Sequence, residues 1–219
     1  EADLLEPGSY KEAMQDCELV FHTASPFFLD SKDAQKELID PAFEGTRNVL
    51  DSVNKTPSVK RVVLTSSVAA IYGDTIDSKN VPDGIFDESV WNTSSTPTQS
   101  EYSYSKTVAE KEAWKICGEQ NRWDLVVINP SLVLGPALNP HSDFESKKFM
   151  VQMGNGDLKS GVPDIKLGIV DVRNVGEAHL NAGYNPDASG RYIISSDSMD
   201  FLTIGKHLLE EFGNKYPIP

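Results

Sequence analysis

The chain has 219 residues, of which 39% are hydrophobic and 24% are charged, an ordinary globular composition. A net charge of −13 and a pI near 4.7 argue against nucleic acid and anionic membranes as partners, because both bind basic patches. There is no run of about 18 apolar residues to form a transmembrane helix, and the acidic N-terminus does not resemble a signal peptide. We therefore expect a soluble cytoplasmic protein, a monomer or a homodimer.

The first part of the chain alternates predicted strands and helices. Compact apolar runs, typical of buried parallel strands, cover residues 18–24, 61–67 and 123–129. Helices are expected over residues 9–14, 31–53 and 101–119. Residues 73–98 are rich in Pro, Asp, Asn, Ser and Thr and are predicted to form a loop. This alternation predicts a parallel α/β sheet flanked by helices.

After Pro136 the pattern is less regular. Helices are expected over residues 143–153, 171–184 and 203–212, with Asp171 as an N-cap. Short strands are expected over residues 166–170 and 191–194. The two cysteines, Cys17 and Cys117, are predicted to be buried thiols without a disulfide. The four histidines lack metal-ligand spacing, so no metal site is expected.

Polar or small residues follow all three strands of the first part. They are His22 to Pro26, Thr65 to Ser67, and Asn129 to Ser131. Ligands of open parallel sheets bind beyond the carboxyl ends of the strands. We therefore expect a site at this edge of the sheet.

Tyr102 and Lys106 open the helix predicted over residues 101–119. Positions i and i+4 of a helix lie on the same face, so the phenol and the ammonium are expected side by side. A nearby cation stabilises a phenolate and lowers the pKa of a tyrosine, which then becomes an acid/base catalyst. Alone, this pair is equally compatible with a surface helix.

Six segments of the sequence carry a shared family pattern. They are VFHTASPF at 20–27, RVVLTSS at 61–67, FDESVW at 86–91, YSYSKTVAEKEAW at 102–114, NPSLVLGP at 129–136 and VDVRNVGEAH at 170–179. Taken together, they resemble the extended short-chain dehydrogenase/reductase family, and most of all its dihydroflavonol reductase, cinnamoyl-CoA reductase and methylglyoxal (ketone) reductase branch. The resemblance runs over essentially the whole chain and implies a Rossmann-type fold that binds NADP, with NAD as the second choice.

The resemblance also implies roles for individual residues. Tyr102 would protonate the substrate oxygen, Lys106 would lower the pKa of Tyr102 and bind the nicotinamide ribose, and Ser67 would polarise the substrate carbonyl. Ser66 takes that role if the register shifts by one. The remaining cofactor contacts expected from the family are Asp3, Leu4, Thr23, Ala24, Ser25, Pro130 and Val133; for Val133, core packing is the alternative.

A glycine-rich GxxGxxG turn, which cradles the dinucleotide pyrophosphate in the family, is not found in this sequence. The resemblance implies that the chain begins near the end of the family's third strand and lacks the first βαβ portion. It also implies a partial Rossmann domain at 1–135 and a mostly substrate-binding lobe at 136–219. Residues 171–185 are expected to pack back on the Rossmann part.

Aromatic residues near the strand ends are candidates for a substrate pocket or for the core. Phe27, Phe28, Tyr72 and Trp91 are in this group, with Phe27 and Tyr72 as the leading candidates. Dihydroflavonol reductases have an Asn where this chain has Tyr72, so a flavonoid substrate is not expected. We expect a small-molecule ketone or aldehyde instead.

Three functions are compatible with these features, and the segments HTASP at 22–26 and FDESVW at 86–91 favour the first over the second. The first is reduction of a ketone or aldehyde to an alcohol by hydride transfer. The second is the reaction of a sugar-nucleotide epimerase or dehydratase of the same fold, since the segment Ile71-Tyr72-Gly73 is similar to the corresponding segment of sugar-nucleotide epimerases. The third is a truncated, non-catalytic binding protein, suggested by the absent glycine-rich turn.

Overall fold

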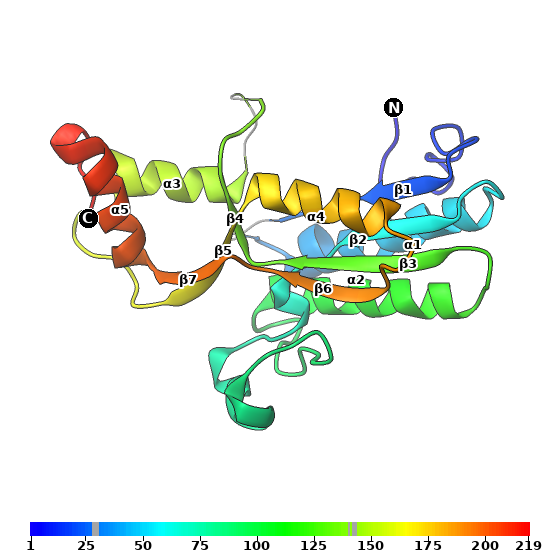
Figure 1. Cartoon of the computed structure of the whole chain (residues 1–219), viewed down its shortest axis with the longest axis horizontal. Coiled ribbons are helices and arrows are strands. Elements are labelled where there is room, and N and C mark those ends of the chain that lie inside the picture. Colours follow the sequence, from blue (N-terminus) through cyan, green and yellow to red (C-terminus); the bar gives the residue numbers. More distant parts are fainter. Residues whose placement is uncertain (28–30, 140, 142–143) are drawn as a thin grey trace. The chain divides into compact units, whose positions relative to one another are not determined.

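The computed structural model describes residues 1–27, 31–139, 141 and 144–219. Four strands form the first sheet in the order β1-β2-β3-β6. Their bounds are Leu19–His22, Arg61–Thr65, Asp124–Pro130 and Gly190–Ile194. β1 pairs with β2 and β2 with β3, both in parallel (Figure 1). The predicted α/β class is confirmed, and the arrangement is Rossmann-like.

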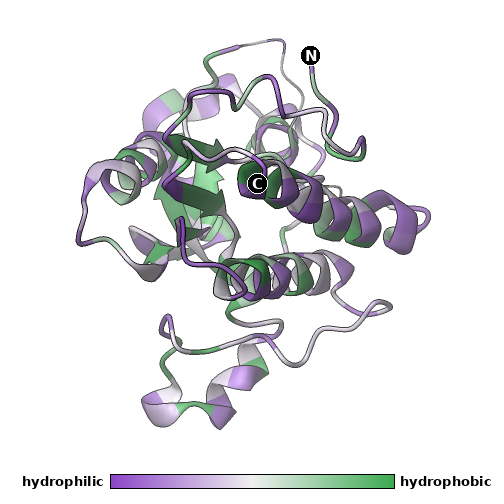
Figure 2. Ribbon diagram, turned by 90° about the vertical axis from the view of Figure 1, so that its right-hand side faces the viewer, coloured by the Kyte–Doolittle hydropathy of each residue, from purple (hydrophilic) through white to green (hydrophobic). Residues whose placement is uncertain are grey.

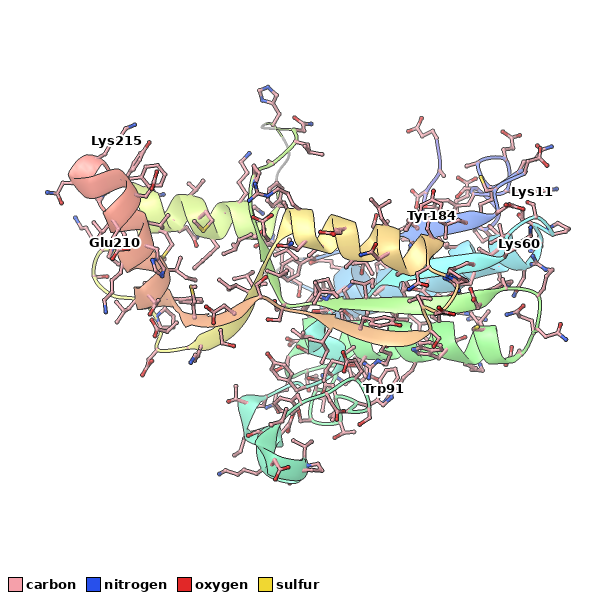
Figure 3. All side chains as sticks on the ribbon, viewed as in Figure 1. Lys11, Lys60, Trp91, Tyr184, Glu210 and Lys215 are labelled. Carbon is pink, nitrogen blue, oxygen red and sulfur yellow. The ribbon has the colours of Figure 1, made fainter. Side chains whose placement is uncertain are left out.

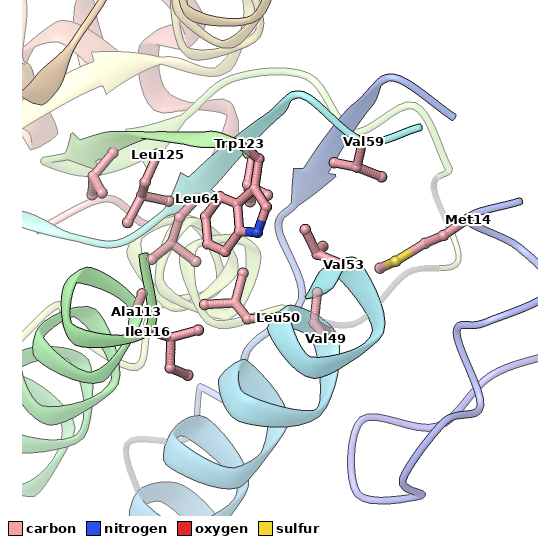
Figure 4. Packing of buried hydrophobic residues seen from close by; sticks show 12 residues of the cluster. Met14, Val49, Leu50, Val53, Val59, Leu64, Ala113, Ile116, Trp123 and Leu125 are labelled. Carbon is pink, nitrogen blue, oxygen red and sulfur yellow. The ribbon is translucent and has the colours of Figure 1, made fainter. Parts of the chain in front are cut away.

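Helices α1 (Asp40–Asn54) and α2 (Glu101–Gly118) cover one face of this sheet. Val49, Leu50 and Val53 of α1 pack with Ala113 of α2 against the side chains that β2 and β3 direct to this face (Figure 4). Trp123, only 3% exposed, closes the cluster at the start of β3. Burial of such side chains stabilises the fold by about 1.5–3 kcal/mol each.

Helix α4 (Val172–Tyr184) covers the opposite face with its last turns. Gly183 lets α4 approach β1 closely, because a Cβ there would lie 2.8 Å from the ring of Phe21 and 2.9 Å from Leu19. The period of two along a strand sends neighbouring side chains to opposite faces. Phe21 therefore meets α4, while the next residue, His22, points to the side of α1 and α2.

A second sheet has the strand order β4-β5-β7. Its strands are Leu132–Leu134, Lys166–Asp171 and Asp197–Asp200, with β4 and β5 parallel and β5 and β7 antiparallel. Helices α3 (Glu145–Asn155) and α5 (Phe201–Phe212) accompany this sheet. Hydropathy colouring shows green strands and helices that carry both green and purple stretches, as expected of helices with one buried face (Figure 2).

Several element boundaries differ from the expectations. Residues 9–14 form turns and not a helix, and a π-helix (Gln35–Ile39) precedes α1. The loop at 73–98 contains the short 3-10 helices Thr75–Asn80 and Pro82–Gly84, while Val68–Ala70 and Gly213–Lys215 form two more. Asp171 does cap α4, since its Oδ1 accepts a hydrogen bond of 2.8 Å from the Arg173 N–H. The expected helix start at Asp143 lies outside the described residues.

The described structure divides into two compact units. Unit 1 comprises Glu1–Pro130 and Glu177–Ile193, and unit 2 comprises Ser131–Gly176 and Ile194–Pro219. The predicted roles of the two parts, cofactor binding and substrate binding, stay predictions. Within the described part of the chain, none of the helices combines the length and the apolarity that crossing a bilayer needs.

Candidate active site

Ser67 lies just beyond the carboxyl end of β2. It caps the 3-10 helix Val68–Ala70, and its Oγ accepts a hydrogen bond of 3.1 Å from the Ala69 N–H. The same hydroxyl lies close enough to the phenol of Tyr102 to favour the phenolate. The neighbouring Ser66 is 6% exposed, and its Oγ has no hydrogen-bond partner among the described residues. The structure thus brings Ser67, and not Ser66, to Tyr102.

Tyr102 stands in the first turn of α2. The residue before the helix, Ser100, has the left-handed backbone conformation (φ 56°) that non-glycine residues rarely adopt. The ring of Phe27 packs against the ring of Tyr102, with centroids 4.4 Å apart. Burial raises the pKa of Tyr102, and the nearby Ser67 hydroxyl acts in the opposite direction more weakly.

Lys106 follows one turn later and is 7% exposed. Its Nζ donates a long hydrogen bond of 3.4 Å to the Thr65 carbonyl, at the end of β2. Burial lowers the pKa of this lysine to about 8, and the negative charge of Glu110 opposes that effect. An ammonium with this pKa is mostly charged at pH 7 and loses its proton within reach of physiological pH.

The pKa of Tyr102 therefore differs from the expectation that Lys106 lowers it. Burial is the larger effect on both groups, because it disfavours the charged form of each. It raises the pKa of the phenol and lowers that of the ammonium, so both neutral forms are favoured. The helical spacing in the sequence indicates which side chains are neighbours, but it does not indicate how far these side chains are buried from solvent.

Ala24 and Ser25, after β1, border a small pocket beside Lys106. Its volume is about 10 Å³, and it is also lined by His22, Thr65, Ser66 and Glu110, among others. A volume of about 10–15 Å³ holds one water molecule. Thr23, between β1 and Ala24, is exposed. Of the predicted cofactor contacts, the structure thus places Ala24 and Ser25 beside Lys106.

The other predicted contacts lie elsewhere. Asp3 and Leu4 form a turn on α1, where the Leu4 carbonyl accepts a hydrogen bond of 2.8 Å from the Asn48 side chain. Pro130 is buried at the end of β3. Tyr72 stacks on Phe86, with ring centroids 4.6 Å apart. Phe28 lies outside the described residues.

Val133 belongs to unit 2, on the wall of a cavity of about 670 Å³. The cavity is mostly apolar and is bounded by residues 133–139 with Phe144, Ser146, Val172 and Arg173. This volume is in the range of small-molecule sites. Among the described residues, no group of three or more His, Cys, Asp or Glu side chains could hold a metal ion.

Sequence reasoning missed a buried ion pair next to the site. Arg191 of β6 and Glu110 of α2 lie 2.6 Å apart, with side chains 6% and 0% exposed. The Arg191 guanidinium also lies over the ring of Trp91 (labelled in Figure 3), 3.8 Å from the ring centroid. Trp91 therefore forms a cation–π contact with Arg191. The position of Glu110, one helical turn after Lys106, could have indicated that the two side chains are neighbours. Arg191 is 81 residues from Glu110, and no local sequence pattern connects it to the pair.

The chain matches the NAD dependent epimerase/dehydratase family over residues 1–182. It is 44% identical, over 195 residues, to cinnamoyl-CoA reductase CAD2 of Medicago truncatula, covering 88% of this chain and 58% of that protein. It is 36% identical to tetraketide alpha-pyrone reductase 1 of Arabidopsis thaliana, covering 100% of this chain and 66% of the relative.

Among solved structures, the yeast methylglyoxal/isovaleraldehyde reductase Gre2 complexed with NADPH matches with a TM-score of 0.82. The identity is 29%, and the match covers 96% of this chain and 66% of that one. The chain thus spans less than two thirds of the length of these relatives.

Proposed function

Because the chain belongs to the NAD dependent epimerase/dehydratase family, we propose that its protein reduces a ketone or aldehyde to an alcohol with NADPH. The observation that carries this proposal is the cluster at the end of β2. There the Ser67 hydroxyl lies close to the phenol of Tyr102, and the buried ammonium of Lys106 lies one helical turn further on. The three relatives described above are all reductases, which supports the same reaction class.

The residues of unit 1 fit a nicotinamide cofactor. Lys106 Nζ has three N–H donors, of which one makes the long bond to Thr65, so donors remain for ribose hydroxyls. The small side chains of Ala24 and Ser25 allow close approach beside it. We propose Thr23, Ala24, Ser25 and Pro130 as further cofactor contacts of unit 1, with Asp3 and Leu4 near the adenine; the contact expected from Val133, in unit 2, stays a prediction. NADPH, when bound, supplies the hydride.

Each catalytic side chain then has one task. Ser67 Oγ and the Tyr102 hydroxyl donate hydrogen bonds to the substrate carbonyl oxygen, which polarises the carbon for hydride addition. Tyr102 gives its proton to that oxygen as the alcohol forms, and the proton and the hydride together account for the two hydrogens added. The charge of Lys106 stabilises the phenolate that remains.

The test begins with binding of NADPH by the protein, measured by fluorescence, and continues with NADPH consumption on small ketones and aldehydes. Tyr102→Phe removes the proton donor and should lower kcat by about 10²- to 10⁴-fold while NADPH still binds. The control is Tyr104→Phe, two residues along the same helix, which should keep its activity. Unchanged turnover in Tyr102→Phe would remove Tyr102 from the mechanism.

A second candidate is the epimerase or dehydratase activity that the family name includes. In such enzymes the hydride leaves and returns within one turnover, so no net NADPH is consumed. Turnover of a nucleotide sugar without consumption of NADPH would favour this candidate. If the protein neither binds NADPH nor turns over either substrate class, the non-catalytic reading holds.

A further inference from the structure

Glu110 is a fully buried carboxylate in the helix that carries Tyr102 and Lys106. Its Oε1 accepts hydrogen bonds from Arg191 Nε at 2.6 Å and from Trp114 Nε1 at 3.2 Å. Its Oε2 accepts from Asn129 Nδ2 at 2.9 Å and from Arg191 Nη2 at 3.5 Å. A buried charge persists only when it is paired and hydrogen-bonded in this way. Four donors from three elements therefore fix this carboxylate in place.

Asn129 connects the carboxylate to the serine of the site. The same Nδ2 that donates to Glu110 also donates to the Ser67 carbonyl, at 3.0 Å. Arg191 adds a second link, because its Nη2 donates to the Ala70 carbonyl at 3.4 Å, in the 3-10 helix that Ser67 caps. Asn129 and Arg191, which both bind the Glu110 carboxylate, thus also hold the backbone around Ser67 by hydrogen bonds to its carbonyl groups.

Lys106 lies on the other side of Glu110. The two side chains are one helical turn apart, and both line the small pocket at the end of β1 and β2. The other titratable groups around Lys106 are His22 from β1, Tyr102 from α2 itself, and Arg191, which reaches Glu110 from β6. Among these, Glu110 carries the negative charge that favours the ammonium.

We propose that Glu110 is a positioning residue that keeps Lys106 in its charged form and, through Asn129, holds the backbone of Ser67. It touches neither substrate nor cofactor and acts through these two neighbours. Arg191 forms an ion pair with the Glu110 carboxylate and so makes the burial of this carboxylate possible. Lys106 lies near enough for the negative charge of Glu110 to stabilise its ammonium. The catalytic role of Glu110 rests on the proposed function. The charge state of Lys106, however, is measurable in the protein without any turnover.

The first experiment measures the titration midpoint of Lys106 by NMR of the protein labelled with ¹³C at lysine, with Lys106→Arg to assign the signal. In Glu110→Gln the opposite charge is lost, and the midpoint should fall by about one pH unit or more. The matched control is Glu112→Gln, on the same helix, whose carboxylate pairs with Arg47 and Lys115. That control should leave the Lys106 midpoint unchanged.

Glu110→Gln leaves Arg191 buried with a neutral partner and could unfold the chain. The double variant Glu110→Gln/Arg191→Met removes both charges and keeps the side-chain volumes, so the same titration can be read in a folded protein. An unchanged Lys106 midpoint in Glu110→Gln, or in the double variant compared with Arg191→Met, would overturn the electrostatic part of the proposal.

Turnover gives the second readout. In the active protein, Glu110→Gln should lower kcat and move the midpoint of the kcat–pH profile in the same direction as the Lys106 midpoint. A loss of kcat at all pH values, without a shift of the profile, would reduce Glu110 to a structural residue. Absence of reductase activity in the unaltered protein would contradict the proposed function, while the NMR comparison would still decide the role of Glu110.

Discussion

Three ionisable side chains near the carboxyl ends of β1 and β2 have pKa values moved by burial. The pKa of Tyr102 is raised, that of Lys106 is lowered to about 8, and that of His22 is lowered to about 4. In each case, burial favours the neutral form. In such surroundings, the electrostatic interaction with a charged neighbour has a large effect on the protonation state of the group. For Lys106, Glu110 is such a neighbour.

His22 gives a prediction at the scale of one residue. It is 5% exposed, and its pKa falls from 6.5 to about 4 because burial and the nearby Lys106 disfavour the imidazolium. Between these pH values the unfolded chain binds more protons than the folded one, so stability falls as the pH falls from 6.5 to 4. The loss attributable to His22 should be about 3 kcal/mol.

The measurement is urea unfolding at several pH values between 4 and 7. His22→Gln should flatten the pH dependence of the unfolding free energy in this window. The control His207→Gln replaces an exposed histidine of α5 and should leave the dependence unchanged. If the slopes of the protein and of His22→Gln agree, the imidazole is not held neutral by the fold.

At the scale of elements, Arg61 joins two strands to the end of a helix. Its guanidinium makes two bonds to the Asp124 carboxylate, of 2.8 and 2.7 Å, which tie β2 to β3. It also donates to the carbonyls of Ala182 and Asn185, at 2.9 and 2.5 Å, at the carboxyl end of α4. A cation at this end of a helix interacts favourably with the helix dipole.

Arg61→Lys keeps the charge but replaces the planar fork with a single ammonium, which cannot make all of these bonds at once. We expect a loss of about 2 kcal/mol of unfolding free energy, measured by urea denaturation. The neighbouring Lys60→Arg is the control, since Lys60 is 68% exposed and pairs with an equally exposed Glu18. That substitution should change stability by less than about 0.5 kcal/mol. Equal stability of Arg61→Lys and the unaltered protein would show that the fork is dispensable.

The elements that the sequence predicts well are those with a strong local pattern. Apolar runs marked β1, β2 and β3, and helical periodicity marked α1, α2 and α5 within a few residues. β4 and β7 were not expected, because they are three and four residues long and form only by pairing with β5. The spacing of Tyr102 and Lys106 was readable, whereas the Arg191–Glu110 pair and the burial of the phenol depend on tertiary packing and have no local pattern.

At the scale of the whole molecule, charge is unbalanced. The chain has 33 acidic and 20 basic residues, a net charge of −13 at pH 7. Like charges repel in the compact state, and salt screens them, with a Debye length of about 30 Å at 0.01 M and about 8 Å at 0.15 M. Exposed ion pairs such as Lys36–Asp33 are weakened too, but each contributes at most about 1 kcal/mol.

We therefore expect the Tm at pH 7 to rise when NaCl is increased from 0.01 to 0.15 M, as measured by circular dichroism. The control is the same pair of measurements near pH 4.7, the pI, where the net charge vanishes and the rise should disappear. A Tm that falls with salt at pH 7 would mean that attractive pairs outweigh the net repulsion.

The pairing of Glu110 with Arg191 also has a consequence for the order of folding. The partners are 81 residues apart, so a growing chain presents α2 long before β6 exists. Until β6 arrives, burying the Glu110 carboxylate would leave a charge without its partner, which is costly. Helix α2 thus reaches its final depth, and Ser67 its final support through Asn129, only with the last strand of the first sheet. During synthesis, Ser67, Tyr102 and Lys106 are therefore made before the strand on which their final packing depends.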